Sequence, residues 1–153
     1  MIAKFDPAIA RLARDARAAL RKRFPTAVEL VYDGYNTLAI GYSSTEKTSD
    51  GIVSLAIYSR GVNLYFIYGR SLPDPEGLLQ GNGKQGAFVR LDDLAVLERP
   101  DVDALIREAV LDGETPLPKR GRGRTIVKWV SKRQRPRRAG GRATARRVSR
   151  RQG

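Results

Sequence analysis

Apolar and polar residues alternate in short runs through the middle of the chain, and apolar residues recur at helical spacing on either side of it. Alternation is typical of β-strands, whereas a period of about 3.6 residues is typical of amphipathic helices. The alternating runs predict five strands, at residues 27–33, 36–42, 51–60, 62–68 and 87–91. Because most connections between them are short, we expect an antiparallel sheet.

The two helical segments have recognisable ends. The first begins at Pro7, a residue type favoured in the first turn, and is expected to stop near Arg23 because Pro25 restrains the residue before it. The second begins at Pro100 and is expected to end before Gly113, a typical C-terminal cap residue. The pattern therefore predicts an α+β domain with the order helix, five-stranded antiparallel sheet, helix.

Residues 62–91 form the stretch around which the other elements are organised. Residues 62–68 are largely apolar or aromatic on both faces, which predicts a central strand. The loop that follows contains Pro73 and Pro75, and these residues withhold backbone donors and argue against another strand. The same loop contains Leu78 and Leu79, whose side chains we expect to be buried against the core.

The second half of this loop reads Gly81-Asn82-Gly83-Lys84. It lacks the spacing and the Ser or Thr of a nucleotide-binding phosphate loop. Glycines permit positive φ, so we expect it at Gly81 or Gly83, where backbone N–H groups would form a small anion nest. The other interpretation is that the glycines only shape a turn. The candidate anion- or ligand-binding residues are Arg70, Asp74, Gly81, Gly83, Lys84, Arg90 and Tyr65.

The same stretch resembles the YdhG-like domains, a bacterial family of unknown function. The resemblance covers roughly residues 6–112 and is carried by Phe66, Gly69, Leu72, Asp74, Pro75, Leu79, Gly81, Gly83, Lys84, Arg90 and Leu91. Family members often have arginine where this chain has Ala87. Some relatives in this family are described as frataxin-like iron chaperones. The resemblance therefore implies two helices on one face of an antiparallel sheet.

The composition bears on that iron role and on catalysis. The chain has no histidine and no cysteine, which excludes disulfides, thiolate chemistry and Ser-His triads. The first helix is basic, whereas iron delivery calls for acidic residues there. The carboxylates of Asp33, Asp50, Asp74 and Glu76 are scattered over turns without a shared spacing. We therefore predict no enzyme, no catalytic residues, no metal site and no cofactor.

Charge divides the chain at residue 118. Residues 119–153 contain 15 of the 29 Lys and Arg residues and none of the 16 Asp and Glu residues. Residues 1–118 are therefore nearly neutral. We predict a YdhG-like α+β domain at residues 1–118 and a mostly disordered Arg-rich arm at residues 119–153. Residues 125–130 are the only apolar patch in the arm, and docking of this patch as an edge strand is one of the open alternatives.

Arginine-rich segments bind phosphates by releasing counterions, so the arm predicts attachment to RNA or DNA. A merely solvated tail is the alternative. No run of residues is long and apolar enough for a signal peptide or a membrane span, which favours a cytoplasmic protein without membrane contact. The candidate nucleic-acid-binding residues are Arg120, Arg122, Arg124, Arg133, Arg135, Arg137, Arg138, Arg142, Arg146, Arg147, Arg150 and Arg151.

These observations favour a small non-catalytic binding module that its arm tethers to nucleic acid and that takes an unknown small ligand at the Pro/Gly loop. Two alternatives stay open. One is a frataxin-like iron or metal chaperone, and the other is an unidentified enzyme that uses the loop of residues 81–84.

Overall fold

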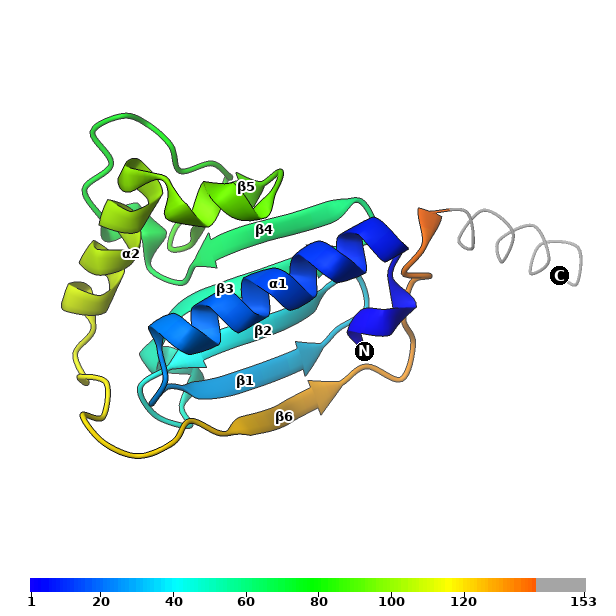
Figure 1. The fold of residues 1–153 in the computed structure, drawn as a ribbon, viewed down its shortest axis with the longest axis horizontal. Coiled ribbons are helices and arrows are strands. Elements are labelled where there is room, and N and C mark those ends of the chain that lie inside the picture. Colours follow the sequence, from blue (N-terminus) through cyan, green and yellow to red (C-terminus); the bar gives the residue numbers. More distant parts are fainter. Residues whose placement is uncertain (140–153) are drawn as a thin grey trace, which may run out of the picture.

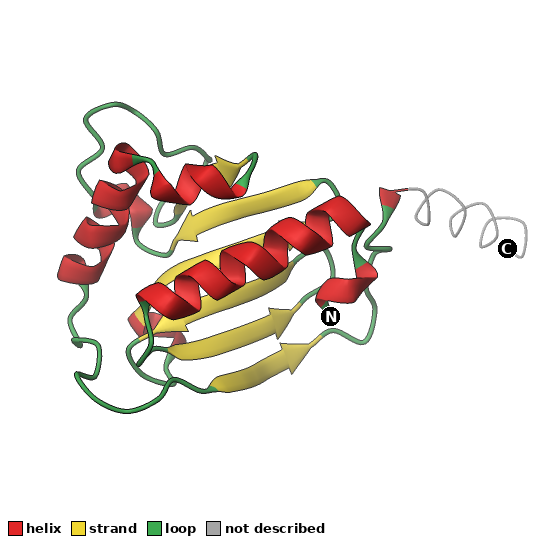
Figure 2. Cartoon of the chain, viewed as in Figure 1, coloured by secondary structure: helices red, strands yellow, loops and turns green. Residues whose placement is uncertain are grey.

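In a computed structural model that describes residues 1–139, two helices cover one face of a six-stranded sheet (Figures 1 and 2). The helices are α1 (Pro7–Arg23) and α2 (Pro100–Asp112). The strands are β1 (Val28–Asp33), β2 (Leu38–Ser43), β3 (Gly51–Tyr58), β4 (Gly61–Phe66), β5 (Ala87–Leu91) and β6 (Thr125–Val130). Short 3-10 turns are η1 (Ile2–Lys4), η2 (Thr48–Asp50), η3 (Gly69–Ser71) and η4 (Leu94–Glu98).

The sheet corrects the prediction of five antiparallel strands. The strand order is β5-β4-β3-β2-β1-β6, and strands β1 to β5 pair in antiparallel fashion. Strand β6 adds to the free edge of β1 and runs parallel to it. The parallel direction is possible because the chain passes through α2 and a long connection before β6 begins. The sheet is therefore mixed, and β4 lies next to its edge rather than at its centre.

One core lies between the sheet and the helices. Alternation along the strands directs residues such as Val31, Ile40, Leu55 and Leu64 to this side, and all four are buried. Helix α1 contributes Ala10, Ala13, Ala16 and Leu20, and α2 contributes Val102, Leu105, Ile106 and Ala109. The small alanines let α1 approach the sheet closely. Both helices thus share one face of the sheet, as the resemblance implied.

Within residues 1–139, neither α-helix lies on the opposite face of the sheet (Figure 1). Its side chains form two rows of successive register partners across the strands from β6 to β5. One row is Ile126, Leu30, Gly41, Ser54, Tyr65 and Phe88, and the other is Trp129, Tyr32, Ala39, Ala56, Asn63 and Arg90. The residues on β2 and β3 are small, so the middle of this open face is lower than its flanks.

The entry to β6 depends on a close backbone approach. The Gly123 N–H donates to the Pro25 carbonyl at 2.8 Å, and a Cβ at Gly123 would lie 2.3 Å from the Ala27 carbonyl oxygen. The Glu29 N–H then donates to the Arg124 carbonyl at 2.7 Å, which aligns the two strands. Any side chain at position 123 would therefore push β6 away from β1.

The segment after β6 also contacts the domain. Composition predicts disorder from Ser131 onward, but within residues 131–139 the Ser131 N–H donates to the Asp33 carbonyl and the Arg135 N–H to the Tyr35 carbonyl, both at 2.8 Å. The docking alternative for residues 125–130 is therefore the one observed. Residues 140–153 of the predicted arm lie outside the described residues, and the domain boundary at residue 118 stays a prediction.

Candidate functional site

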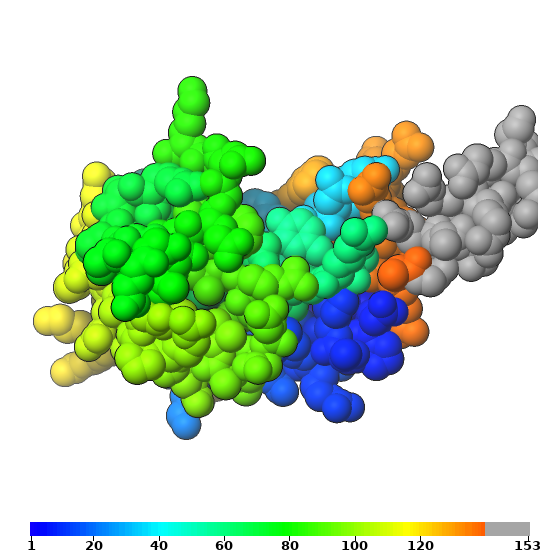
Figure 3. Space-filling view, turned by 90° about the horizontal axis from the view of Figure 1, so that it is seen from above, coloured from blue at the N-terminus to red at the C-terminus, as the bar shows by residue number. Residues whose placement is uncertain are grey.

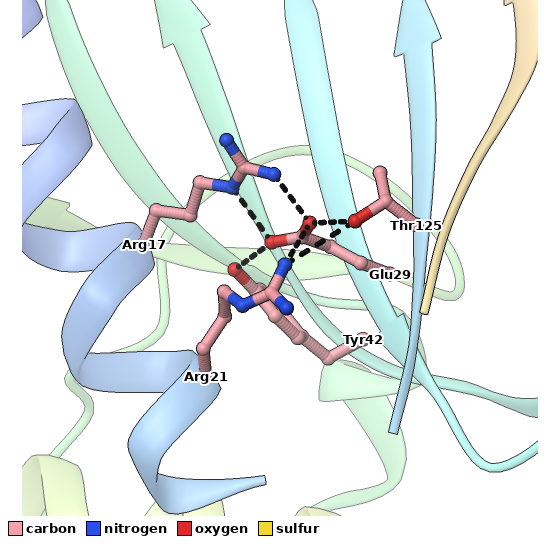
Figure 4. Close-up of polar contacts among 5 residues, drawn as sticks. All are labelled: Arg17, Arg21, Glu29, Tyr42 and Thr125. Atoms are coloured by element: carbon pink, nitrogen blue, oxygen red, sulfur yellow. Dashed lines mark hydrogen bonds and ion pairs between the residues drawn. The ribbon is translucent and has the colours of Figure 1, made fainter. Parts of the chain in front are cut away.

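A buried carboxylate joins the first helix, the sheet and the C-terminal segment (Figure 4). The Glu29 side chain is 2 % exposed and points from β1 toward α1. Arg17 donates to it through two nitrogens, at 2.9 and 2.7 Å, and Arg21 donates at 2.9 Å. The hydroxyls of Tyr42 and Thr125 each donate at 2.8 Å. Five hydrogen bonds thus satisfy both oxygens of the Glu29 carboxylate. Without these partners, burial of its charge would be strongly unfavourable.

This arrangement sets the protonation of the cluster. Burial acts to raise the pKa of Glu29, but hydrogen bonds from Arg17, Thr125 and Tyr42 and the charge of Arg17 lower this pKa to about 2. Burial raises the pKa of the Tyr42 phenol, and the charge of Glu29 raises it further. The hydrogen bond to Glu29 raises the pKa of Arg17. The carboxylate is therefore fixed in its ionised form and is not suited to proton transfer near neutral pH.

We expect the charge on Glu29 to make stability depend on pH in acid. Its pKa falls from an ordinary value of 4.5 to about 2 on folding, so its contribution is complete above about pH 4.5 and is lost as the pH falls toward 2. The difference in free energy of unfolding between wild type and Glu29→Gln should therefore shrink by about 3 kcal/mol as the pH falls through this range. Urea denaturation at a series of pH values measures both. A difference that stays constant from neutral pH to about pH 3 would contradict the assignment.

A second buried ion pair lies at the other end of β1. Arg137 Nη2 donates to Asp33 Oδ1 at 2.6 Å and to the Gly34 carbonyl at 2.8 Å, and both charged side chains are 5 % exposed. The guanidinium also lies over the Phe5 ring, 5.4 Å from its centroid. Arg137 was predicted to bind nucleic acid, but burial leaves its guanidinium out of reach of a phosphate in this arrangement. Its contacts are instead structural.

The Pro/Gly loop is braced from within. The Asp74 carboxylate accepts hydrogen bonds from the N–H groups of Leu78 and Leu79, at 2.8 and 2.9 Å. The Arg70 guanidinium donates to the carbonyls of Gly81 and Gly83. Both leucines pack against the core, where we expected them to be buried, but they are only partly buried. Gly81 has a φ of 113°, as expected for one of the two glycines.

The structure brings only part of the predicted anion site together. Arg70 lies beside the two glycines, but its Nε and Nη2 groups donate to their carbonyl oxygens. These two donors are therefore not free to bind an anion. Lys84 is exposed on the loop. Arg90 lies near the other end of β5, where its Nη2 donates to the Arg60 carbonyl at 2.8 Å. Tyr65 lies on the open face and contacts Gly86, whose added Cβ would collide with the phenol.

A hollow lies beside the Pro/Gly loop, where the small ligand was predicted. It has a volume of about 270 Å³ and separates Pro73, Pro75 and Leu78 from Ala104 and Leu105 of α2. Its rim carries the carboxylates of Asp74, Glu76, Asp101 and Glu108. Asp74 is engaged by the loop backbone and Asp101 by Arg99, at 2.6 Å. A ligand at this loop stays a prediction.

Basic side chains gather along the β6 edge of the sheet. Arg124 forms an ion pair with Glu46 at 3.1 Å, and Lys128 Nζ donates to the Glu46 carbonyl at 3.2 Å. Arg135 lies over the Tyr35 ring, 5.9 Å from its centroid, and Arg138 donates to a backbone carbonyl at the N-terminus. Other basic residues here are exposed, namely Lys119, Arg120, Arg122, Lys132 and Arg133.

The remaining predicted nucleic-acid contacts lie outside the described residues, namely Arg142, Arg146, Arg147, Arg150 and Arg151. Within residues 1–139, no group of three or more His, Cys, Asp or Glu side chains is arranged to hold a metal ion. Over the same residues, no helix has the length and apolar character needed to span a bilayer.

The sequence patterns did not predict the cluster around Glu29. The arginines of α1 follow a helical pattern typical of a solvated face, whereas Arg17 and Arg21 turn inward to the carboxylate. One signal was present: Glu29 is the only charged residue between Val28 and Tyr32, and alternation places it on the same side of the strand as Val31. A charge on that side requires a partner. Nothing in the local pattern identified Thr125 as one.

In comparisons with known proteins, no family model, no curated protein and no solved structure matches the chain. The YdhG-like resemblance therefore stays a prediction from the sequence. The α+β fold, with two helices on a six-stranded mixed sheet, is the class that the structure defines.

Proposed function

We propose that this protein is a small non-catalytic binding module that attaches to nucleic acid through the basic β6 edge, defined as the basic side chains of residues 119–138. The observation that carries the proposal is the charge of this segment. It contains no Asp or Glu, and most of its Lys and Arg side chains are exposed. Strand β6 holds part of this charge on the folded domain, which reduces the ordering cost of binding.

The chemistry of these side chains suits phosphates. Guanidinium groups donate in a planar fork that matches phosphate oxygens, and binding releases counterions from the nucleic acid. Glu46 neutralises Arg124, and Asp33 neutralises Arg137, so only these two arginines are withdrawn into ion pairs among the described residues of the segment. The rest retain their charge for an anionic partner.

We expect the full chain to bind duplex DNA with little sequence preference and with a steep dependence on salt. About five phosphate contacts would give a slope of about −4.5 for log affinity against log salt. The triple variant Arg120→Glu, Arg122→Glu, Arg133→Glu should lower the affinity at least about tenfold and flatten the slope by about three units. Fluorescence anisotropy with a labelled duplex measures both quantities.

A matched control lies on α1. Arg11 and Arg14 are exposed, and Arg11→Glu, Arg14→Glu changes charge on the helix layer without touching the β6 edge. We expect this variant to retain most of the affinity. If the control loses as much affinity as the triple variant, binding comes from the overall charge or from α1. If wild type does not bind duplex DNA even at low salt, the attachment itself is wrong.

A further inference from the structure

The open face of the sheet has a hollow at its centre. It has a volume of about 270 Å³, and its lining is almost entirely apolar. Its floor is formed by Ala39, Gly41 and Ser54 of β2 and β3, and Tyr32 and Tyr65 lie on either side. The hollow exists because the central strands carry small side chains and their neighbours carry large ones.

The two flanks of this hollow are built differently. In Figure 3 the loop after β4, in green, and the segment around β6, in orange, rise on either side of a recess on the face away from α1. The loop side presents Tyr65 and Phe88 from β4 and β5, both partly exposed. The β6 side presents Trp129, which pairs in register with Tyr32 and is 55 % exposed. Aromatic rings therefore border the hollow on both sides.

Positive charge lies next to these rings. Lys128 and Lys132 flank Trp129 in the chain, and Arg135 stacks on the Tyr35 ring close by. The Trp129 ring rests against Gly34, since a Cβ at that glycine would lie 3.6 Å from the indole. Tryptophan is enriched among the residues that dominate binding interfaces, so an exposed indole ring here favours a binding surface. Here the surrounding charge is positive, so the complementary partner carries both flat apolar rings and negative groups.

We propose that the open face binds the unpaired bases of a single-stranded nucleic acid, with its phosphates along the basic β6 edge. The proposal rests on the proposed function and adds the strandedness of the ligand. In a duplex the ring faces of the bases are stacked inside the helix, so the protein reaches mainly phosphates and groove edges. In a single strand the bases are free to stack on aromatic side chains.

The experiment compares three labelled probes with the full chain at one salt concentration. They are a single-stranded oligonucleotide, a duplex of the same sequence, and a single strand of the same length with abasic positions. Stacking contributes about 1–3 kcal/mol for each base, which converts to about 5- to 150-fold in affinity. Trp129→Ala should therefore weaken binding of the single strand by about that factor and leave binding of the duplex and the abasic strand nearly unchanged.

Two further variants separate stacking from folding. Trp129→Tyr keeps an aromatic ring and should retain most of the affinity for single strands. Tyr65→Leu removes a ring on β4, far from β6, and should weaken single-strand binding without affecting the duplex. Leu111→Ala, at an exposed apolar side chain of α2, is the matched control and should change neither. Quenching of Trp129 fluorescence by the single strand gives an independent readout.

The outcomes distinguish the two proposals. If Trp129→Ala weakens binding of single strands and duplex equally, or leaves both unchanged, the base-binding face is overturned while phosphate attachment stands. If wild type binds the abasic strand as tightly as the normal one, the same conclusion follows. If wild type binds none of the three probes at low salt, the proposed attachment fails as well.

Discussion

Cutting the chain after Pro118 is expected to lower the free energy of unfolding by about 3 kcal/mol or more. The cut removes Arg137 and its hydrogen bonds to Asp33 and Gly34, and a hydrogen bond to a charged group contributes about 1.5–3 kcal/mol. It also removes Thr125 from Glu29 and leaves β1 as an open edge of the sheet. Urea denaturation followed by circular dichroism measures the loss.

The matched control is a chain cut after Ala139. This shorter truncation retains β6, Thr125 and Arg137 and should therefore retain the stability that their contacts supply. Unchanged unfolding of the chain that ends at Pro118 would mean that residues 119–139 are held too weakly to matter. The basic segment would then be a separate arm, and β6 would not hold its charge on the folded domain.

Glu29→Ala is expected to destabilise the protein by about 3–5 kcal/mol. The substitution removes the acceptor of five hydrogen bonds and leaves the buried Tyr42 hydroxyl without a partner. It also leaves Arg17 and Arg21 side by side without the charge between them. The midpoint of thermal unfolding and the free energy from urea denaturation should both fall.

Glu114→Ala provides the comparison, because this glutamate is exposed and should change stability by less than about 0.5 kcal/mol. Arg17→Lys tests the geometry separately. Lysine keeps the charge but cannot donate in the two-pronged manner seen here, so an intermediate loss is expected. Equal stability of wild type and Glu29→Ala would show that solvent, rather than the arginines, satisfies this carboxylate.

Local patterns were sufficient for most of the first 112 residues. Proline at the first helical position placed the start of both helices, and Ala87–Leu91 is a strand as its alternation predicts. Capping was less predictable, since Asp6 occupies the N-cap position of α1 but makes no side-chain cap bond. The strands could be predicted because apolar and polar residues alternate within each strand, and this pattern does not depend on which strands pair.

The sixth strand and the two ion pairs on β1 depend on contacts that local patterns do not encode. Composition near Arg137 is typical of disorder, yet this arginine pairs with Asp33, 104 positions earlier. The buried position of the Arg137 guanidinium depends on the Asp33 carboxylate of β1, which is distant in the sequence. The arginines of α1 pose the same problem, because Arg11 is exposed and Arg17 is paired although both follow the same helical pattern.

The late position of β6 in the chain has a consequence for folding. The contacts from Glu29 to Thr125 and from Asp33 to Arg137 span 96 and 104 positions. Contacts between residues so far apart in the chain form slowly, so we expect them to form after the local pairing of the other strands. During synthesis, β1 and its two carboxylates leave the ribosome well before residues 125–137. Until residues 125–137 emerge, the nascent chain exposes β1 as an unpaired strand edge, which could pair with another chain.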